Sequence, residues 1–269
     1  ARGLTLREDG GRRRTLAVPA TDRPLEIGPV DLVLFCVKTY DLGPAIVTAR
    51  PLVGAESLVL PFENGVEAPD RLADAFGAER VAAGVSYVLG VLDAPGVVSY
   101  GGILGGLAFG ELDASPSRRL ASVAGLFRSA GLDARVVPDA RAALWEKLVL
   151  VCATGGVLAV LRAPIGDALA SPGGPAMLLA VMREAVAVAG AMGVPLLEET
   201  AERHMRFIRE EMAPGAMSSQ LLDLLAGRRL ELESLNGYVV RMGRKHGVAT
   251  PVNARIYSEL LPFVGGGER

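Results

Sequence analysis

Histidine and cysteine are both scarce in this chain, which has two of each among 269 residues. Cys36 and Cys152 lie inside apolar stretches, so we expect small buried residues in a reducing compartment rather than a disulfide. The four residues also lack the paired spacing that a structural zinc site needs. The sequence therefore predicts neither a disulfide nor a metal centre.

Long basic runs and membrane-length apolar runs are missing as well. The net charge is −2, so nothing marks a nucleic-acid surface or a polybasic membrane anchor. Residues 1–15 are locally basic but lack the apolar region of a signal peptide. The longest largely apolar run, residues 148–161, is shorter than a spanning helix needs and is followed by Arg162. With 50% hydrophobic residues, the chain is predicted to be globular, soluble and cytoplasmic, without nucleic-acid or membrane partners.

The first half of the chain carries an α/β pattern. Residues 31–38 (DLVLFCVK) and 57–60 are continuous apolar runs of strand length, typical of strands buried on both faces of a parallel sheet. Between them, residues 41–53 have helical character interrupted at Gly43-Pro44. Further strands are expected over 80–88 and 132–137, an antiparallel pair over 97–100 and 107–111, and helices over 69–76 and 115–130, the last with Leu120, Val123, Leu126 and Phe127 on its apolar face.

From residue 139 onward the pattern is almost entirely helical. This change of character predicts an α/β half, residues 1–138, and an all-helical half, residues 139–269. Breaks between helices are expected at Gly155-Gly156, Ala163-Pro164, 171–175, 192–195, Pro214-Gly215 and Gly247.

One lysine stands inside the long apolar helical pattern of residues 140–166. Lys147, Val151 and Thr154 share a face beside a stripe with the i, i+3, i+4, i+7 spacing of a buried helix. A lysine at the edge of a core helix ordinarily extends its ammonium to solvent. The segment alone therefore does not mark Lys147 as reactive. The buried stripe consists of Trp145, Leu148, Val149 and Cys152.

Two polar residues follow the buried strands of the first half. Ligands of open parallel sheets collect beyond the carboxyl ends of the strands, where Lys38 and Asn64 are expected. A lysine there can meet a phosphate, and an asparagine amide can hold a ribose or a substrate carbonyl. The alternatives are a strand-terminating cation for Lys38 and a left-handed turn residue for Asn64, which precedes Gly65.

A third candidate region is residues 217–247. Glu231 stands in the first turn of a predicted helix, where the helix dipole favours a carboxylate without any functional role. Ser218 or Ser219 can cap the preceding helix. The predicted core stripe of the later helix consists of Leu232, Leu235, Val239 and Met242.

These motifs occur in a fixed order: VK, ENG, WEK, SS, E-x-E-x-x-NG and HG-x-x-TPVN. As an ordered set they resemble the ketopantoate reductase (2-dehydropantoate 2-reductase) family over nearly the whole chain. The resemblance implies a Rossmann-like dinucleotide-binding domain in residues 1–138 and an all-α substrate and dimerisation domain in residues 139–269. It implies an NADPH-dependent reductase that converts a 2-oxo acid to a 2-hydroxy acid in pantothenate biosynthesis, and a homodimer.

The resemblance also assigns roles residue by residue. Lys147 matches the catalytic lysine, which would polarise the keto group and deliver the proton to its oxygen. Glu231 matches the glutamate close to the reaction centre and the cofactor. The remaining matches are Lys38, Asn64 and Gly90 as cofactor contacts, Asn64 also beside the substrate, and Ser219 on the substrate carboxylate.

Two departures from the family pattern carry predictions. The chain has no G-x-G-x-x-G turn, so roughly thirty to forty residues of the opening βαβ unit are expected to be missing, and the chain as given is predicted to bind NADPH weakly or not at all. Asparagines of the pantoate-forming members are replaced by Val151, Gly155 and Ile165. A less polar pocket predicts a bulkier or more apolar 2-oxo acid as substrate.

Two other functions fit part of the pattern. A related 3-hydroxyacid or 6-phosphogluconate type dehydrogenase also places a lysine on a helix of an all-α domain. A catalytically silent dimerisation module would account for the missing glycine turn. Residues 175–192 and 229–245 could supply its dimer interface.

Overall fold

The computed structural model describes residues 3–8, 11–88, 90–100 and 106–267. An N-terminal sheet-and-helix part and a C-terminal helical part are present, as predicted. The chain forms two compact units. Unit 1 comprises residues 1–37, 42–63 and 69–140, and unit 2 comprises residues 38–41, 64–68 and 141–269. Unit 2 thus includes two short loops of the first half, with Lys38 and Asn64, that the predicted division at residue 138 assigned to the α/β half.

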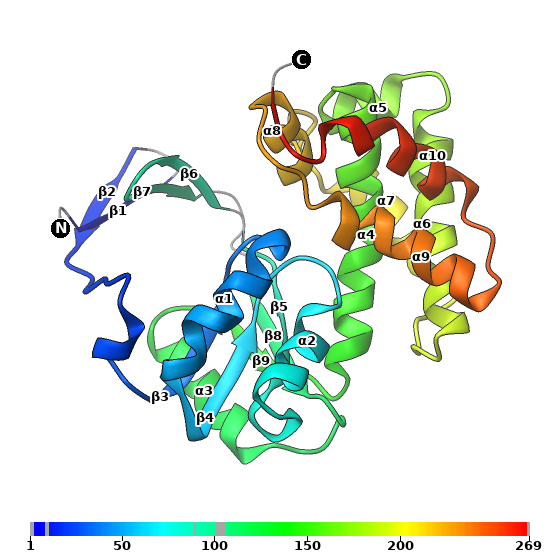
Figure 1. Ribbon diagram of the computed structural model, residues 1–269. Coiled ribbons are helices and arrows are strands. Elements are labelled where there is room, and N and C mark those ends of the chain that lie inside the picture. The colour runs from blue at the N-terminus through cyan, green and yellow to red at the C-terminus, as the bar shows by residue number, and fades with distance from the viewer. Residues whose placement is uncertain (1–2, 9–10, 89, 101–105, 268–269) are drawn as a thin grey trace. The chain divides into compact units, whose positions relative to one another are not determined.

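The central strands of unit 1 begin with the predicted parallel pair (Figure 1). β3 (Val30–Phe35) runs parallel to β4 (Val53–Pro61), with Val33 opposite Val59. β4 adjoins β5 (Ala82–Ser86) through a parallel bridge between Val59 and Val81. β5 pairs antiparallel with β8 (Leu107–Glu111), and β8 pairs parallel with β9 (Ala134–Val136).

The prediction that both faces of each strand are buried is confirmed for the second half of β4 and is wrong for β3. In β3, Val33 and Phe35 are buried whereas Leu34 is 42% exposed. Cys36 is exposed as well, so the prediction of a buried Cys36 is wrong. Successive side chains of an extended segment point to opposite faces, so burying Phe35 turns both of its neighbours outward.

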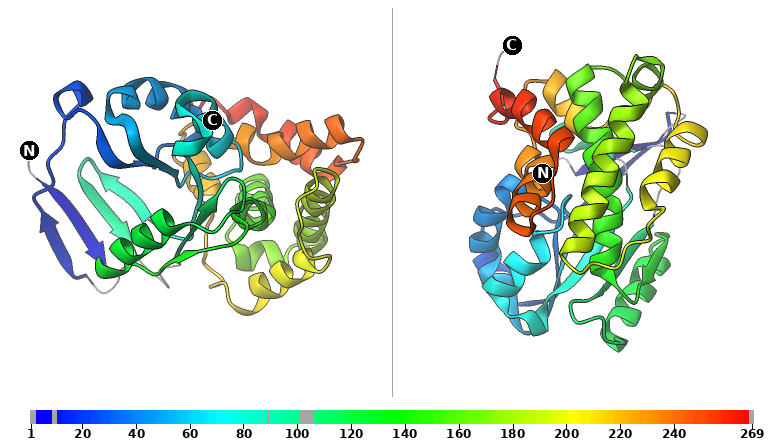
Figure 2. Two further views of the ribbon diagram at one scale, coloured as in Figure 1. Left: turned by 90° about the horizontal axis from the view of Figure 1, so that it is seen from below. Right: turned by 90° about the vertical axis from the view of Figure 1, so that its right-hand side faces the viewer.

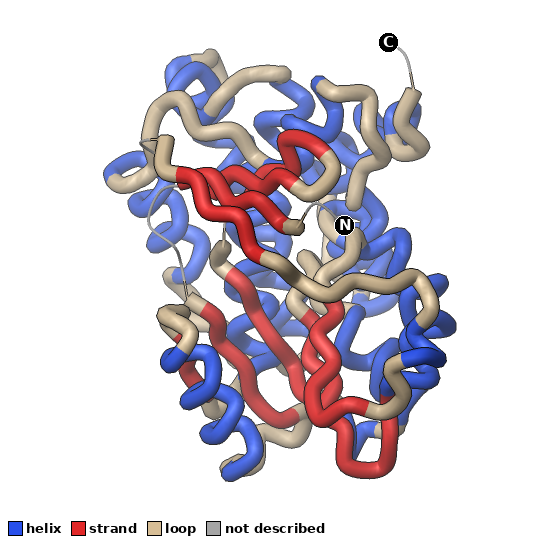
Figure 3. Tube along the Cα trace, turned by 90° about the vertical axis from the view of Figure 1, so that its left-hand side faces the viewer, coloured by secondary structure: helices blue, strands red, loops and turns tan. Residues whose placement is uncertain are grey.

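The predicted pairing of residues 97–100 with 107–111 is wrong. β7 (Val97–Tyr100) pairs antiparallel with β6 (Gly90–Ala94) and parallel with β1 (Leu4–Glu8). β8 is largely buried and β7 only half-buried, so the two strands match different partners. The glycine-rich turn, residues 101–105, lies outside the described residues. β2 (Arg13–Leu16) completes a sheet with the order β2-β1-β7-β6, which Figure 3 shows apart from the central strands.

The helices of unit 1 cover the central strands. α3 (Arg118–Ser129) packs on β8 and β9 through Leu120, Ala124 and Phe127. Leu126, predicted on this face, is 59% exposed, because six residues after Leu120 it lies about 240° around the helix. The other helices are α1 (Leu42–Ala49), which Gly43-Pro44 do not interrupt since Pro44 falls in the first turn, and α2 (Ala68–Phe76).

Unit 2 is built around α4 (Ala140–Leu161), whose predicted stripe of Trp145, Leu148, Val149 and Cys152 is buried. α6 packs against α5, α7, α9 and α10, as Figure 2 shows. The helices after α4 are α5 (Ile165–Ala170), α6 (Gly174–Ala191), α7 (Thr200–Glu210), α8 (Ser219–Leu225), α9 (Asn236–His246) and α10 (Pro251–Leu260).

The predicted break at Gly155-Gly156 is wrong, because α4 continues through both glycines. A Cβ on Gly156 would lie only 2.8 Å from Oδ1 of Asn236. The buried amide of Asn236 donates to the carbonyl of Cys152 at 3.1 Å and to Oδ1 of Asn253 at 2.9 Å. Gly156 therefore lets a buried asparagine reach the backbone of α4.

α4 and α6 are long and apolar enough to cross a membrane by length and composition alone. The apolar run predicted from the sequence, residues 148–161, is shorter than α4 because it begins only after Lys147. In α4, 67% of the most apolar window is buried inside the protein. A core helix of a globular protein meets the same criterion, and α4 occupies that position.

Candidate functional site

Lys38 stands in a loop that belongs to unit 2. β3 ends at Phe35, and Lys38 immediately precedes the 3₁₀ turn η2 (Thr39–Asp41). Its Nζ donates to Oδ2 of Asp223 at 2.6 Å and lies 3.6 Å from Oε2 of Glu231. The guanidinium of Arg229 lies over the ring of Tyr40, 4.0 Å from its centroid. Lys38 is therefore held by two carboxylates and does not merely end a strand.

Glu231 connects both loops of unit 2 that come from the first half of the chain. Its side chain is 5% exposed. Oε1 accepts the backbone N–H of Thr39 at 3.0 Å, and Oε2 accepts Nδ2 of Asn64 at 3.1 Å. A buried carboxylate needs such donors, and here they come from loops more than 160 residues away in sequence.

The prediction that Glu231 begins one continuous helix is wrong. A 3₁₀ turn, η5 (Leu232–Ser234), follows it, and the backbone of Leu235 leaves the helical region at φ −110° and ψ −108° before α9 begins. Leu232, Leu235 and Val239 of the predicted stripe are nevertheless buried. Hydrogen bonds, rather than the dipole of a long helix, thus account for the carboxylate of Glu231.

Asn64 joins Glu231 to Lys147. The left-handed residue of its turn is Gly65, with φ +85°, so the left-handed alternative for Asn64 is wrong. A Cβ on Gly65 would lie 2.9 Å from the carbonyl oxygen of Ser234, which explains the glycine. Oδ1 of Asn64 accepts a hydrogen bond from Nζ of Lys147 at 3.0 Å. The amide therefore bridges a lysine on α4 and a buried carboxylate.

The two lysines differ in their electrostatics. Burial lowers the pKa of Lys147 from 10.5 to about 8, against the opposing charge of Glu231. Burial also disfavours the charge of Lys38, but the hydrogen bond to Asp223 and the charge of Glu231 outweigh it and raise its pKa above the ordinary value. Lys38 thus stays cationic, whereas Lys147 can exchange a proton close to neutral pH.

Ser219 lies at the start of α8 and is exposed. Ser218 is the N-cap of α8, since its hydroxyl accepts the N–H of Leu221 at 3.2 Å, and Ser219 is not used for capping. Ser219 and Asp223 stand at positions i and i+4 of α8, so both lie on one face of the helix. Within the described part of the chain, the Ser219 hydroxyl makes no hydrogen bond to Lys147, Asn64 or Glu231, so its role stays a prediction.

Gly90 belongs to a different part of the structure. It lies on the exposed strand β6 of unit 1, opposite Tyr100. A Cβ there would meet Val98 at 3.7 Å, an ordinary contact, so packing does not require a glycine. Its role in cofactor binding stays a prediction.

Asp223 is a member of the cluster that the sequence interpretation missed. Its carboxylate accepts Lys38 through Oδ2 and Nε of Arg228 through Oδ1, at 2.6 and 2.7 Å. The available signal was an aspartate inside an otherwise apolar helix, SQLLDLL, because a buried carboxylate is seldom found without a cation.

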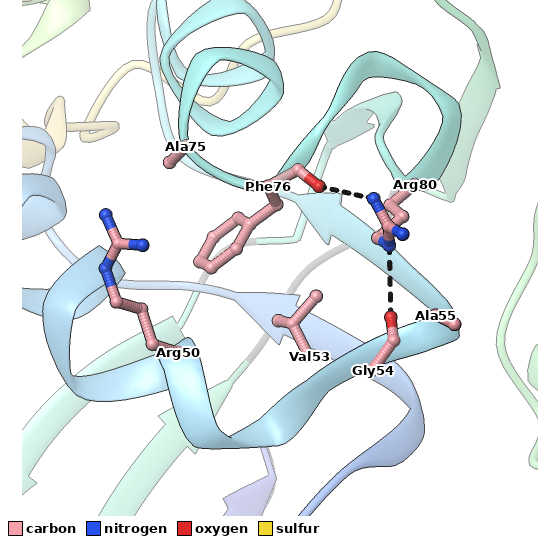
Figure 4. Close-up of a pocket in the computed structure, with 7 residues that line it drawn as sticks. All are labelled: Arg50, Val53, Gly54, Ala55, Ala75, Phe76 and Arg80. Atoms are coloured by element: carbon pink, nitrogen blue, oxygen red, sulfur yellow. Dashed lines mark hydrogen bonds between the residues drawn. The ribbon is translucent and has the colours of Figure 1, made fainter.

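A cavity of about 360 Å³ lies elsewhere, in unit 1 (Figure 4). It sits beside the start of β4, away from the carboxyl end where ligands of parallel sheets bind. Arg80 closes one side by donating to the carbonyls of Gly54 at 3.1 Å and Phe76 at 2.9 Å, so its guanidinium serves the structure. The lining residues are Arg50, Val53, Gly54, Ala55, Ala75, Phe76 and Arg80.

No group of three or more His, Cys, Asp and Glu side chains in the described residues is arranged to hold a metal ion. Lys147, Asn64, Glu231 and Lys38 come together as the sequence order suggested, with Asp223 added.

Known proteins are similar to this chain in sequence and in fold. The family described as "Ketopantoate reductase PanE/ApbA" matches residues 1–114, and "Ketopantoate reductase PanE/ApbA C terminal" matches residues 139–262. The chain is 34% identical to the 2-dehydropantoate 2-reductase of Halobacterium salinarum over 248 residues, covering 92% of this chain and 80% of that protein. The corresponding values for the enzyme of Caulobacter vibrioides are 33%, 91% and 82%.

Solved structures are also similar to this chain in fold. A PanE/ApbA family ketopantoate reductase from Ralstonia eutropha superposes with a TM-score of 0.87 at 33% identity, covering 97% of this chain and 85% of that one. D-mandelate dehydrogenase with NADH and anilino(oxo)acetate reaches 0.86 at 19% identity, with 97% and 84% covered, which speaks for the fold alone. By both family matches, these identities and the shared fold, the chain belongs to the ketopantoate reductase family.

Proposed function

We propose that this protein reduces a ketopantoate-like 2-oxo acid to the 2-hydroxy acid with NADPH, as a step of pantothenate biosynthesis. The observation that carries the proposal is the setting of Lys147, whose ammonium donates to Asn64 at 3.0 Å and whose pKa is lowered to about 8. Family membership supplies the reaction class. The cluster supplies a lysine suited to give up a proton.

Lys147 acts as the general acid in this proposal. An ammonium group has three donors, and Asn64 takes one of them. The remaining donors can polarise the keto group of the substrate, and one proton passes to the keto oxygen as the alkoxide develops. The amine that remains keeps its hydrogen bond to Asn64. The charge of Glu231 favours reprotonation for the next turnover.

The residues around Glu231 fit the nicotinamide end of the cofactor. The carboxylate can accept ribose hydroxyls, and Lys38 and Asn64 offer donors beside it. We assign Lys38, Asn64, Glu231 and the backbone of Gly90 to cofactor binding. When bound, the cofactor supplies the hydride that reaches the keto carbon.

Ser219 is assigned to the substrate carboxylate. Its hydroxyl is free of the capping role that Ser218 fills, and it shares a helix face with Asp223, which binds Lys38. Asn64 is placed beside both substrate and cofactor, since its amide touches Lys147 as well as Glu231.

A direct assay tests this function. The protein is mixed with NADPH and ketopantoate, the fall in NADPH absorbance is followed, and the 2-hydroxy acid is identified by mass spectrometry. NADH in place of NADPH tests the cofactor assignment. Because the chain lacks a G-x-G-x-x-G turn and is predicted to bind NADPH weakly, the assay uses a high NADPH concentration, at which the expected result is turnover. A protein that oxidises neither cofactor with ketopantoate or with branched apolar 2-oxo acids would be the catalytically silent module instead.

We also propose that the protein is a homodimer. The expectation comes from the family resemblance and from the apolar helix α6 (Gly174–Ala191). Light scattering coupled to size-exclusion chromatography should give about twice the chain mass of 28.0 kDa. A mass of one chain at micromolar concentration would refute the dimer and leave the reductase proposal intact.

A further inference from the structure

Arg229, an arginine outside the cluster, holds the far end of the loop that carries Lys38. Its guanidinium carbon lies 4.0 Å from the centroid of the Tyr40 ring, and its Nη1 lies 3.6 Å from Oδ1 of Asp41. A cation over the face of an aromatic ring is attracted by the negative charge of that face. Arg229 therefore binds the two loop residues that follow Thr39.

The same stretch of the chain, residues 223–231, holds the start of the loop. Its Asp223 accepts Nζ of Lys38 at 2.6 Å, and its Glu231 accepts the backbone N–H of Thr39 at 3.0 Å. Loop and stretch both belong to unit 2. The start of the loop is thus fixed by two buried carboxylates, and its end is fixed by an arginine.

A hydrogen bond inside the loop connects its two ends. The backbone N–H of Asp41 donates to the carbonyl of Lys38 at 2.8 Å and closes the 3₁₀ turn η2. Hydrogen bonds of a 3₁₀ turn have poorer geometry than those of an α-helix, so a single turn depends on outside contacts to keep its shape. Holding Tyr40 therefore also holds the backbone from which the side chain of Lys38 extends.

We propose that Arg229 is a positioning residue for cofactor binding: by stacking on Tyr40 it fixes the turn from which Lys38 reaches the cofactor. The inference rests on the proposed reductase function, in which Lys38 binds the cofactor, and adds a residue that acts through the loop. The stacking carries the effect, because the ion pair with Asp41 is exposed and 3.6 Å long. Proton transfer from Lys147 is left unchanged.

Steady-state kinetics at high NADPH concentrations test the positioning role. Arg229→Met keeps a long side chain and removes its charge, and Tyr40→Leu removes the ring. Each should raise the KM for NADPH by about 2- to 5-fold, the effect of an exposed cation–π contact. Neither should change kcat or its pH dependence near pH 8. The two substitutions combined should cost no more than either alone, because they remove the same contact.

Two conservative variants separate the stacking from other features of the loop. Tyr40→Phe keeps the ring, and Asp41→Asn weakens only the ion pair, so both should keep the KM for NADPH within about twofold of the wild-type value. A KM that rises as much in Tyr40→Phe as in Tyr40→Leu would overturn the stacking.

Hydrogen–deuterium exchange without cofactor gives a readout besides activity. The backbone amides of Thr39 and Asp41 are both hydrogen-bonded in the loop. Loosening the turn should make these amides exchange about 2- to 5-fold faster in Arg229→Met, since exchange reports local opening. An Arg229→Met protein with wild-type exchange at both amides would overturn the proposal.

The outcomes distinguish this inference from the function beneath it. Wild-type turnover with an unchanged KM for NADPH in Arg229→Met would refute the role of Arg229 alone. A fall of kcat in Arg229→Met without a rise of that KM would also refute it, because positioning Lys38 acts on binding. A wild-type protein that oxidises no NADPH with any 2-oxo acid would instead refute the proposed reductase.

Discussion

Lys147 and Lys38 are the same side chain in two environments, and their environments determine what each can do. Lys38 has two carboxylates within 3.6 Å, and its pKa lies above the ordinary value. Lys147 has one neutral amide as its direct partner, and burial lowers its pKa to about 8. A permanent cation suits binding, whereas a titrating amine suits proton transfer. The proposed roles follow from this difference.

The pH dependence of the reaction should show the titration of Lys147. Reduction needs the ammonium form, so kcat/KM for the 2-oxo acid should be level below a pKa of about 8. Above it, kcat/KM should fall about tenfold per pH unit as the proton donor is lost. Oxidation of the 2-hydroxy acid needs the amine and should show the opposite slope. Initial rates between pH 6 and 10 measure both, and a flat profile across pH 8 would exclude Lys147 as the titrating acid.

Glu231→Gln should move that profile toward lower pH. The charge of Glu231 raises the pKa of Lys147 against the effect of burial, and the neutral amide removes this support. Glu233→Gln is the matched control, because Glu233 lies two residues away with a side chain that is 53% exposed and pairs with Arg241. The control should keep the wild-type profile. Equal profiles for the two variants would show that Glu231 does not act on Lys147.

At the scale of elements, two short loops carry Lys38 and Asn64, two of the five side chains of the cluster. Residues 38–41 and 64–68 leave the strands of unit 1 and join the helical unit. Asp223 fixes the first loop through Lys38, and Glu231 fixes both loops through Thr39 and Asn64. The positions of Lys38 and Asn64, which we propose to bind the cofactor, therefore depend on α8 and on the segment before η5.

Asp223→Asn should weaken cofactor binding with little change in kcat. Losing the charge of the carboxylate weakens the 2.6 Å contact of Lys38, because the asparagine oxygen still accepts but is neutral. A charged hydrogen bond of this kind is worth about 1.5–3 kcal/mol, so the KM for NADPH should rise by up to roughly 10-fold. Asp41→Asn is the control in the same loop, since its pair with Arg229 is exposed and 3.6 Å long. Steady-state KM values compare the two, and an unchanged KM for Asp223→Asn would contradict the account.

The two adjacent glycines of α4 should respond to alanine in opposite ways. Gly156→Ala places a methyl group 2.8 Å from Asn236 and Ile256, and such overpacking costs about 1–3 kcal/mol of unfolding free energy. Gly155→Ala meets only ordinary contacts and should gain up to about 1 kcal/mol from helix propensity. Urea denaturation followed by circular dichroism measures both. Equal effects of the two substitutions would show that Asn236 does not pack as described.

At the scale of the whole molecule, the order of the elements could be predicted from local patterns. The parallel pair β3 and β4, the buried stripe of α4 and the helical second half each follow from runs of apolar residues. The pairing of β7 and the burial of Cys36 and Leu126 were predicted wrongly, because local pattern does not say which neighbour covers a surface. Gly155-Gly156 was read as a break because propensity alone ignores the buried Asn236.

The grouping of four candidate residues could be predicted from the sequence, but their contacts could not, and their roles stay predictions. Lys147, Asn64, Glu231 and Lys38 were proposed as candidates because an ordered set of short motifs resembles a family, and the structure brings them into contact. Their contacts join residues 83 to 192 positions apart, which no local pattern contains. Asp223 was missed for the same reason.

The central claim is that Lys147 delivers the proton. The most direct test is kcat for ketopantoate reduction by Lys147→Met, which keeps a long apolar side chain and removes the amine. The account predicts a loss of about 10²–10⁴-fold, the range of general acid catalysis, with an unchanged circular dichroism spectrum and no titration near pH 8. A Lys147→Met protein that keeps more than about a tenth of the wild-type kcat, or still titrates near pH 8, would contradict it.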